Sequence, residues 1–219
     1  GMAGRADILV PFVDGDWEGD LRSEAQTVSR TGFGDPTIRI ALFFVGAPAL
    51  TRGEFASFEP ETIIGGIVRV RVPLGQYEAD KFINLGSNRW SVSPQFGVSH
   101  VAGRFLLEAY AAAWFFSDNS EFLGTRTLAQ NPLLTFQVHA GYLFRRGFWL
   151  AVSSRQSLGG ATSVDGGDKT TPETSNRVGA TLAIPIAQKY ALKFIATTGL
   201  TATIGNDYDT FGVALQVVL

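Results

Sequence analysis

The stretch WSVSPQFGVS, residues 90–99, alternates between apolar side chains and small or polar ones. One set of alternate positions is wholly apolar: Trp90, Val92, Pro94, Phe96 and Val98. The other set holds only serine, glutamine and glycine. A period of two residues is that of a β-strand, whose successive side chains point to opposite faces of the sheet. The stretch therefore predicts a strand with one apolar face, and the class of protein depends on whether that face points inward or outward.

The same alternation recurs along most of the chain and predicts ten strands. Many of them exceed the usual strand of about 5–6 residues and reach the roughly 9–11 residues that a tilted strand needs to cross a bilayer. The predicted strands cover residues 6–17, 34–46, 61–73, 89–101, 104–116, 132–145, 148–156, 175–186, 190–202 and 208–219.

Short and long connections alternate between these strands, which is the layout of an outer-membrane barrel. The short ones are 102–104, 145–147 and 187–190, and the long polar ones are 74–88, 117–131 and 157–174. An even number of strands puts both chain ends on the side of the short turns. One connection, 46–61, is longer than this pattern predicts, and Thr51 with Glu54 three residues later indicates a capping box and a small helix there.

The amino-acid composition further restricts the class of protein and the kinds of functional site. Only 17% of the residues are charged, against roughly 25% in an ordinary soluble domain. The absence of cysteine excludes a disulfide scaffold, a thiolate metal site and a cysteine nucleophile. A net charge of −2 gives no argument for nucleic-acid binding. There is no apolar run of about 18 residues for a transmembrane helix and no signal peptide. We expect residues 1–219 to form a single domain.

Two arrangements of the faces compete. A soluble barrel or sandwich would bury the apolar faces and expose a surface rich in lysine, glutamate and aspartate. The polar faces here carry serine, threonine, glycine, glutamine and scattered arginine instead. A membrane barrel turns the apolar faces to lipid and the polar faces to a lumen, with aromatic residues, here such as Trp90 and Trp114, near the strand ends. The sequence therefore predicts an all-β, antiparallel, up-and-down transmembrane β-barrel with about ten strands in this chain.

Several long stretches resemble one family. They are RTGFGDPTIRIALFFVGAPAL (30–50), VPLGQYEADKFINLGSNRWSVSPQFGVSH (72–100) and AWFFSDNSEFLG (113–124), with weaker likeness at 9–20 and 204–216. Together they are similar to bacterial outer-membrane proteins of the meta-pathway of phenol degradation, which are often described as transporters. The resemblance covers essentially the whole chain. It implies a barrel in the bacterial outer membrane that passes aromatic or other hydrophobic compounds, with no catalytic residues and no cofactor.

The chain departs from that family at both ends. Members usually have two further strands before the one that begins here near Ala6, which makes a family barrel of about twelve strands. Ten strands would either close into a narrower barrel or leave an open edge, which a neighbouring copy in a homo-oligomer could fill. The last residue is Leu219, where outer-membrane proteins typically end in phenylalanine.

The alternation also predicts which polar side chains line a lumen or substrate path. They are Arg39, Arg69, Arg71, Gln95, Glu108, Gln137, His139, Arg155, Arg177 and Lys193. Arg39, Arg69 and Arg71 lie on sequential strands and could form a basic ladder that favours carboxylates or phenolates. Alternatively, the arginines pair with Glu108 and with loop carboxylates and merely fill a small barrel.

Three other features invite a functional interpretation. His139 with Ser153 on the next strand raises the question of a lipid hydrolase, but no Ser-His-acid spacing is recognisable. The loop 75–89 mixes apolar side chains, among them Tyr77 and Phe82, with charges, and could fold inward as a plug or binding surface. Asp35, between glycine and proline, is expected to shape a turn into a strand.

No metal site is expected, because the spacing of Asp118, Asn119 and Glu121 fits no known cation loop. The sequence leaves three functional hypotheses. The first is a passive channel for small, aromatic or hydrophobic molecules, with lipid or detergent and the solute as its partners. The second is a structural or adhesive barrel without transport, and the third, least favoured, is an outer-membrane lipid hydrolase.

Overall fold

The computed structural model describes residues 1–21, 24–51, 53–54, 57–59, 61–187, 189–202 and 209–217. Ten strands form one antiparallel sheet in the order β1-β4-β5-β6-β7-β10-β11-β13-β14-β15. Its strands are β1 Gly4–Leu9, β4 Thr37–Val45, β5 Thr62–Arg71, β6 Ser91–Ala102, β7 Phe105–Phe116, β10 Leu133–Arg145, β11 Phe148–Gly159, β13 Glu173–Ala187, β14 Tyr190–Ala202 and β15 Thr210–Val217. In the described part of the chain, no helix is both long and apolar enough to cross a membrane.

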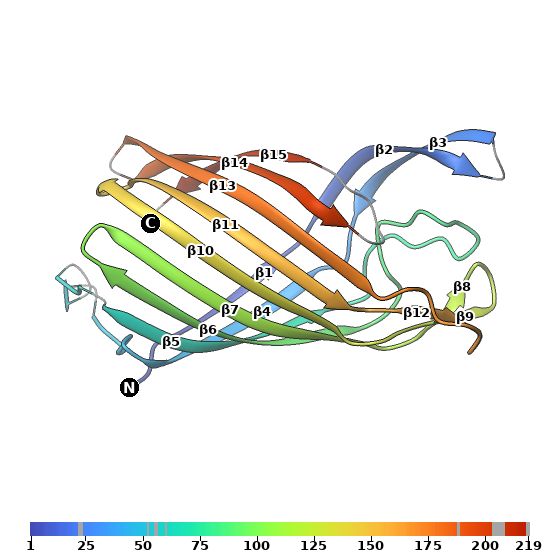
Figure 1. The fold of residues 1–219 in the computed structure, drawn as a ribbon, viewed down its shortest axis with the longest axis horizontal. Coiled ribbons are helices and arrows are strands. Elements are labelled where there is room, and N and C mark those ends of the chain that lie inside the picture. Colours follow the sequence, from blue (N-terminus) through green and yellow to red (C-terminus); the bar gives the residue numbers. More distant parts are fainter. Residues whose placement is uncertain are drawn as a thin grey trace.

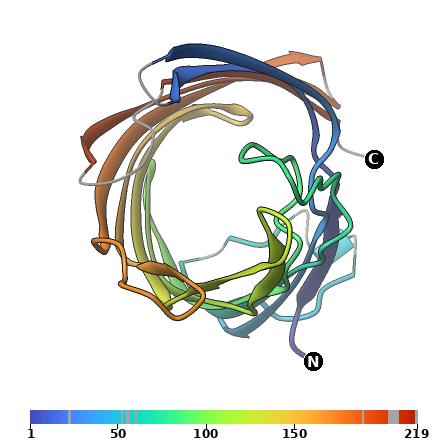
Figure 2. The same cartoon turned by 90° about the vertical axis from the view of Figure 1, so that its right-hand side faces the viewer.

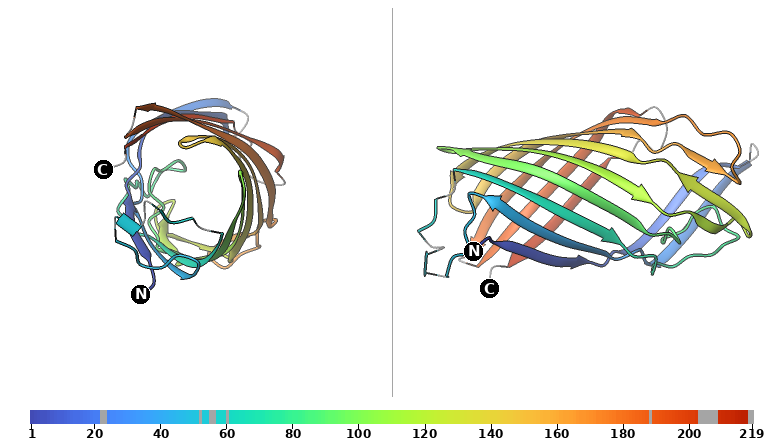
Figure 3. Two further views of the ribbon diagram at one scale, coloured as in Figure 1. Left: turned by 90° about the vertical axis from the view of Figure 1, so that its left-hand side faces the viewer. Right: turned by 90° about the horizontal axis from the view of Figure 1, so that it is seen from below.

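The sheet curls round into a barrel (Figures 1 and 2). Its edge strands β1 and β15 are each paired within the sheet to a single neighbour, β4 and β14, and no pairing joins the two edges in the described residues. The start of β1 and the end of β15 lie at the end of the barrel that carries the short turns (Figure 3). The prediction that a second copy covers an open edge stays a prediction.

Each of the ten predicted strands corresponds to one strand of this sheet, and the short and long connections alternate as expected. The first predicted strand, 6–17, is wrong in one respect: it is interrupted after β1 and continues as β2 (Phe12–Leu21). Pro11 lies in the interruption and has no N–H to give to a ladder. Its carbonyl instead accepts a hydrogen bond of 3.0 Å from Gly34 N.

The hairpin of β2 and β3 (Glu24–Phe33) extends past the long-loop end of the barrel (Figure 1) and escaped the sequence analysis. Its acidic and glycine-rich composition has low β-propensity. Polar pairs across the hairpin hold it together. Ser29 Oγ donates to Asp16 at 2.5 Å, and Thr31 Oγ1 donates to Asp14.

Two segments predicted as plain loops also contain strands. β8 (Asn119–Phe122), β9 (Arg126–Gln130) and β12 (Thr162–Val164) form a small separate sheet at the same end of the barrel. Arg126 Nε donates to Asp165 Oδ2 at 2.8 Å, and this contact together with the N–H of Thr127 holds the pKa of Asp165 below its usual value. Strands this short give no periodic signal in a sequence, which explains why they were missed.

The capping box in the 46–61 connection is confirmed. Thr51 N donates to Glu54 Oε2 at 2.8 Å, and Glu54 N donates back to Thr51 Oγ1 at 3.4 Å. The hydroxyl and the N–H of Thr51 hold the pKa of the Glu54 carboxyl below its usual value. Gly53 and Glu54 are helical, and the rest of the predicted helix lies partly outside the described residues.

Pro94 interrupts the ladder between β6 and β7 but makes no bulge. Val92 pairs with Phe115 and Gln95 pairs with Ala112, so the register is the same on both sides of the gap. On its other edge Pro94 stays in register with Val68 of β5. The proline therefore removes hydrogen bonds locally and leaves the wall of the barrel in register.

Asp35 does more than shape a turn. Its buried carboxylate accepts hydrogen bonds from Gly75 N at 2.9 Å, Ser87 N at 2.8 Å and Ser87 Oγ at 2.6 Å. Gly75 is packed so tightly that a Cβ there would lie 2.6 Å from Asp35 N. One carboxylate at the start of β4 thus fixes both ends of the loop between β5 and β6.

Replacing Asp35 with alanine should loosen this loop. Three donors would lose their acceptor, and an unsatisfied buried donor costs about 1–3 kcal/mol. We expect amide hydrogen exchange at Gly75 and Ser87 to accelerate about tenfold or more. The control is Asp80→Ala, because the Asp80 side chain is 73% exposed and pairs only with its neighbour Lys81. Unchanged protection at both amides would show that Asp35 does not anchor the loop.

Candidate functional site on the inner face of the barrel

The two faces of the sheet have opposite character. On β6, Phe96 is 55% exposed on the outer face, whereas Ser91 and Ser93 on the inner face are 1% and 0% exposed. On β10, the outer-face residues Phe136 and Val138 are 48% and 54% exposed. The apolar faces therefore cover the outside of the barrel, which is the reverse of a water-soluble protein.

Register places all ten predicted lumen residues at inner-face positions of eight strands. One row across the sheet runs Ser99, Glu108, His139, Ser153, Gly179 and Thr197. The next row toward the long loops brings Gln137, Arg155 and Arg177 side by side. Arg39 and Arg69 are paired neighbours in a further row. Lys193 lies apart, near the short turns, with its ammonium 5.5 Å from the ring centre of Trp149.

The largest hollow, about 1020 Å³, is lined mainly by outer-face residues such as Val138 and Val152. Two other cavities meet on the inner face at Glu108. One, about 520 Å³, continues toward the short turns past His139 and Gly141. The other, about 310 Å³, reaches Arg39 and Asp7. The polar side chains of this face therefore border connected space.

The predicted pairing of the arginines with Glu108 is absent from the described contacts. Glu108 accepts a hydrogen bond of 2.9 Å from the Tyr110 hydroxyl instead. Arg39 does pair with a carboxylate, that of Asp7 on β1, at 2.6 Å. Arg69 and Arg71 lie against the ring of Trp114, at 5.8 and 5.2 Å from its centre. Sequence analysis missed Trp114 as a partner because it was assigned to the aromatic residues near strand ends.

His139, Ser153 and Glu108 occupy one row, but their hydrogen bonds do not build a catalytic triad. The Ser153 hydroxyl donates to the Gly179 carbonyl at 3.4 Å, away from His139. The Glu108 carboxylate accepts from Tyr110, and the His139 ring packs edge-on against the Tyr110 ring with centres 5.8 Å apart. A serine nucleophile needs a base within hydrogen-bond reach, which is not the arrangement here.

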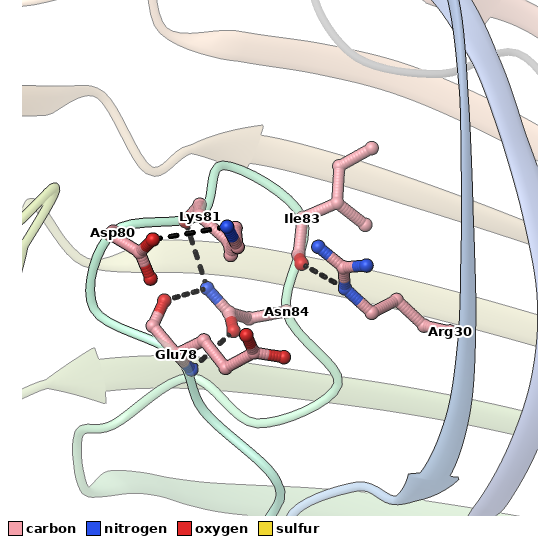
Figure 4. Close-up of polar contacts among 6 residues, drawn as sticks. All are labelled: Arg30, Glu78, Asp80, Lys81, Ile83 and Asn84. Atoms are coloured by element: carbon pink, nitrogen blue, oxygen red, sulfur yellow. Dashed lines mark hydrogen bonds and ion pairs between the residues drawn. The ribbon is translucent and has the colours of Figure 1, made fainter.

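The loop between β5 and β6 lies inside the outline of the barrel (Figure 2). Figure 4 shows how it holds its shape: Asn84 accepts from Glu78 N at 2.7 Å and donates to the carbonyls of Glu78 and Lys81 at 3.0 and 2.9 Å. Arg30 of β3 adds a hydrogen bond of 3.1 Å to the Ile83 carbonyl. The loop is thus fixed from within and from the hairpin above it.

The two loop residues singled out by the sequence have different places. Tyr77 is half-buried, and its hydroxyl accepts from Asn119 Nδ2 at 2.8 Å and donates to the Glu121 carbonyl at 3.2 Å. Phe82 is 65% exposed. Tyr77 therefore joins two loops, whereas the side chain of Phe82 is left exposed. Among the described residues, no group of three or more histidine, aspartate or glutamate side chains could hold a metal ion.

Comparisons with known proteins agree with this geometry. A solved structure described as the COG4313 outer membrane channel from Pseudomonas putida F1 matches with a TM-score of 0.78 and 21% identity, over 98% of this chain and 75% of that one. No protein of curated description matches the sequence. Residues 3–215 match the family described as "Putative MetA-pathway of phenol degradation". The chain therefore belongs to this family of the phenol-degradation pathway.

Proposed function

We propose that this protein is a passive channel of the bacterial outer membrane for small aromatic or hydrophobic molecules. The observation that carries the proposal is the polar inner face with two cavities that meet at Glu108, enclosed by a wall whose outer face is apolar. Membership of the phenol-degradation family and the likeness to a channel both support it.

The outer face supports a position in a bilayer. Near the short turns, Phe105, Tyr142, Phe144 and Phe148 form a chain of ring contacts with centres 4.7–5.1 Å apart. Toward the long loops, Trp90 is 51% exposed. Aromatic residues near both ends of the strands are typical of barrels that cross a membrane, since aromatic rings favour the two membrane–water interfaces. Lipid, or detergent in its place, is the partner that this surface requires.

Passage would need no chemistry from the protein. A solute would enter beside the loop that carries Phe82, move along the inner face past His139 and Glu108, and leave at the short-turn end. Small serine, threonine and glycine side chains leave width for a ring, and weak polar contacts let the solute go again. The family and the likeness to a channel point to a non-enzyme, and the hydrogen bonds of Ser153 give no support to a hydrolase.

The second candidate is a barrel without transport. It draws on one observation, the position of the β5–β6 loop inside the barrel, held by Asp35 and Asn84. A loop fixed in that position could close the lumen. Flux measurements separate the two candidates.

Labelling of single cysteines should distinguish the faces, since the natural chain has none. In vesicles, a charged, water-soluble thiol reagent should modify Gln137→Cys on the inner face. It should spare Val138→Cys, because that neighbouring position would be covered by lipid. Modification of Val138→Cys with protection of Gln137→Cys would reverse the assignment of the faces.

Flux through the lumen should depend on its width at Ser153. Vesicles containing the protein should take up arabinose and phenyl glucoside, which a bilayer excludes. Ser153→Trp should reduce uptake of both several-fold, because the indole would project from the inner face into the lumen beside His139. Val152→Trp, on the outer face at 53% exposure of the native side chain, is the matched control and should leave uptake unchanged. No uptake by the unaltered protein would refute the channel and favour the barrel without transport.

A further inference from the structure

We propose that Arg69, Arg71 and Arg89 form, with Trp114 and Phe116, a low-affinity binding site for aromatic carboxylates on the inner wall near the long loops. We call these five residues the arginine–aromatic cluster. The inference rests on the proposed function, because the ligand would be a solute on its way through the lumen. It extends that function by specifying that the solute carries a negative charge and an aromatic ring.

Three neighbouring strands bring the cluster together. In the register, Arg71 of β5 lies beside Ser91 of β6, which lies beside Phe116 of β7. Arg69 lies beside Ser93 in the same way. The guanidinium of Arg71 is 5.2 Å from the ring centre of Trp114, and that of Arg69 is 5.8 Å from it. Arg89, just before β6, places its guanidinium 4.6 Å from the ring centre of Phe116.

The positive charges of the cluster are not matched by carboxylates. Within the described ranges, Arg69, Arg71 and Arg89 form no ion pair. Arg155 and Arg39 both act on Arg69 with like charge, and only Arg39 has a carboxylate partner, Asp7. An anion in the lumen would meet an excess of positive charge here.

Arg89 shows the same imbalance. Its Nη2 donates to Gln130, whereas its buried Nη1 has no hydrogen-bond partner. Burial, and after it the charge of Arg71, lowers the pKa of Arg89, and the charges of Asp118 and Asp35 act in the opposite direction. The Asp35 carboxylate is already committed to Gly75 and Ser87. The Nη1 donor of Arg89 is therefore left without an acceptor from the described part of the chain.

The serines beneath the cluster give an independent indication. Ser91 and Ser93 are 1% and 0% exposed, and neither hydroxyl has a hydrogen-bond partner in the described part of the chain. Buried polar groups are nearly always paired in a folded protein, so an unpaired one calls for an explanation such as a bound water or ion. Here they lie next to Arg71 and Arg69. This part of the wall has more donors than the protein itself satisfies.

The chemistry of the cluster favours an anion that carries a ring. A guanidinium donates to a carboxylate through two parallel N–H groups and also stacks on aromatic faces. Arg69, Arg71 and Arg89 already lie against Trp114 and Phe116, so an aryl group could add to the stack while its carboxylate accepts from a neighbouring arginine. Arg69, Arg71 and Phe116 are partly exposed. Weak binding suits such a site, because a channel must release what it binds.

Fluorescence of Trp114 tests the binding directly. The protein in detergent, with Trp17, Trp90 and Trp149 replaced by phenylalanine, would be titrated at pH 8 with benzoate, acetate or phenyl glucoside. We expect a saturable change with benzoate, a weaker one with acetate and none with phenyl glucoside. The double variant Arg69→Gln/Arg71→Gln should weaken the benzoate response at least about tenfold. No saturable response to benzoate, or an equal response in the double variant, would overturn the proposal.

Two further variants serve as controls for the benzoate titration. Arg126→Gln removes an arginine of the small β8–β9–β12 sheet that pairs with Asp165. This variant should bind benzoate as the unaltered protein does. Arg69→Lys/Arg71→Lys keeps the charge but loses the two-pronged donor, so its affinity should lie between those of the unaltered protein and the glutamine variant. Each variant must show the heat-shifted gel band of a folded barrel. If the glutamine variant does not fold by this criterion, benzoate binding by the lysine variant tests the proposal.

Ion selectivity in planar bilayers separates this proposal from the channel itself. With a salt gradient across the bilayer, the reversal potential should show a preference for anions that shifts toward cations in the glutamine variant. A protein that binds benzoate but conducts nothing would keep the site and refute the channel. A protein that conducts without saturable benzoate binding would keep the channel and refute the site.

Discussion

Hydrocarbon offers no hydrogen bonds, so every backbone N–H and C=O that crosses it must find a partner in the protein. The long antiparallel strands of the ten-stranded sheet meet this constraint across most of the molecule, because each strand forms backbone hydrogen bonds with the strands beside it. The same constraint explains why a proline is tolerated in the wall at position 94. Its missing donor falls in a short gap beside β7, and the register continues beyond the gap.

The apolar outer face leaves the inner face to carry everything polar. Arginines that would be costly in lipid are acceptable there because they border connected cavities or lie against Trp114. The long loops then fold over and into one end of the barrel, and buried Asp35 connects them to the start of β4. The outer face is therefore constrained by lipid, whereas the inner face is free to carry polar and charged side chains.

Much of this could be predicted from the sequence. Period-two alternation, as in residues 90–99, located ten strands, and the shortage of charged residues indicated which face is outside. The capping box at Thr51 and Glu54 was predicted because its signal is local. Each of these features depends on residues that are close in sequence.

The features that escaped depend on residues far apart in the chain. The carboxylate of Asp35 reaches Ser87 through three-dimensional packing, so its neighbours in sequence suggested only a turn. Trp114 was read as an interfacial residue, because nothing local shows that two arginines of β5 lie against it. The β2–β3 hairpin is rich in acidic residues and glycine, and polar pairs between its two strands, such as Ser29 with Asp16, hold it together.

Refolding from urea with and without a bilayer tests the central claim most directly. If lipid fixes the outside of the protein, dilution into vesicles should restore β-structure, measured by circular dichroism, together with a heat-shifted band on a gel. Dilution into buffer alone should give neither, because the exposed apolar faces would aggregate. A monodisperse, cooperatively unfolding β-protein in buffer without lipid or detergent would contradict the account.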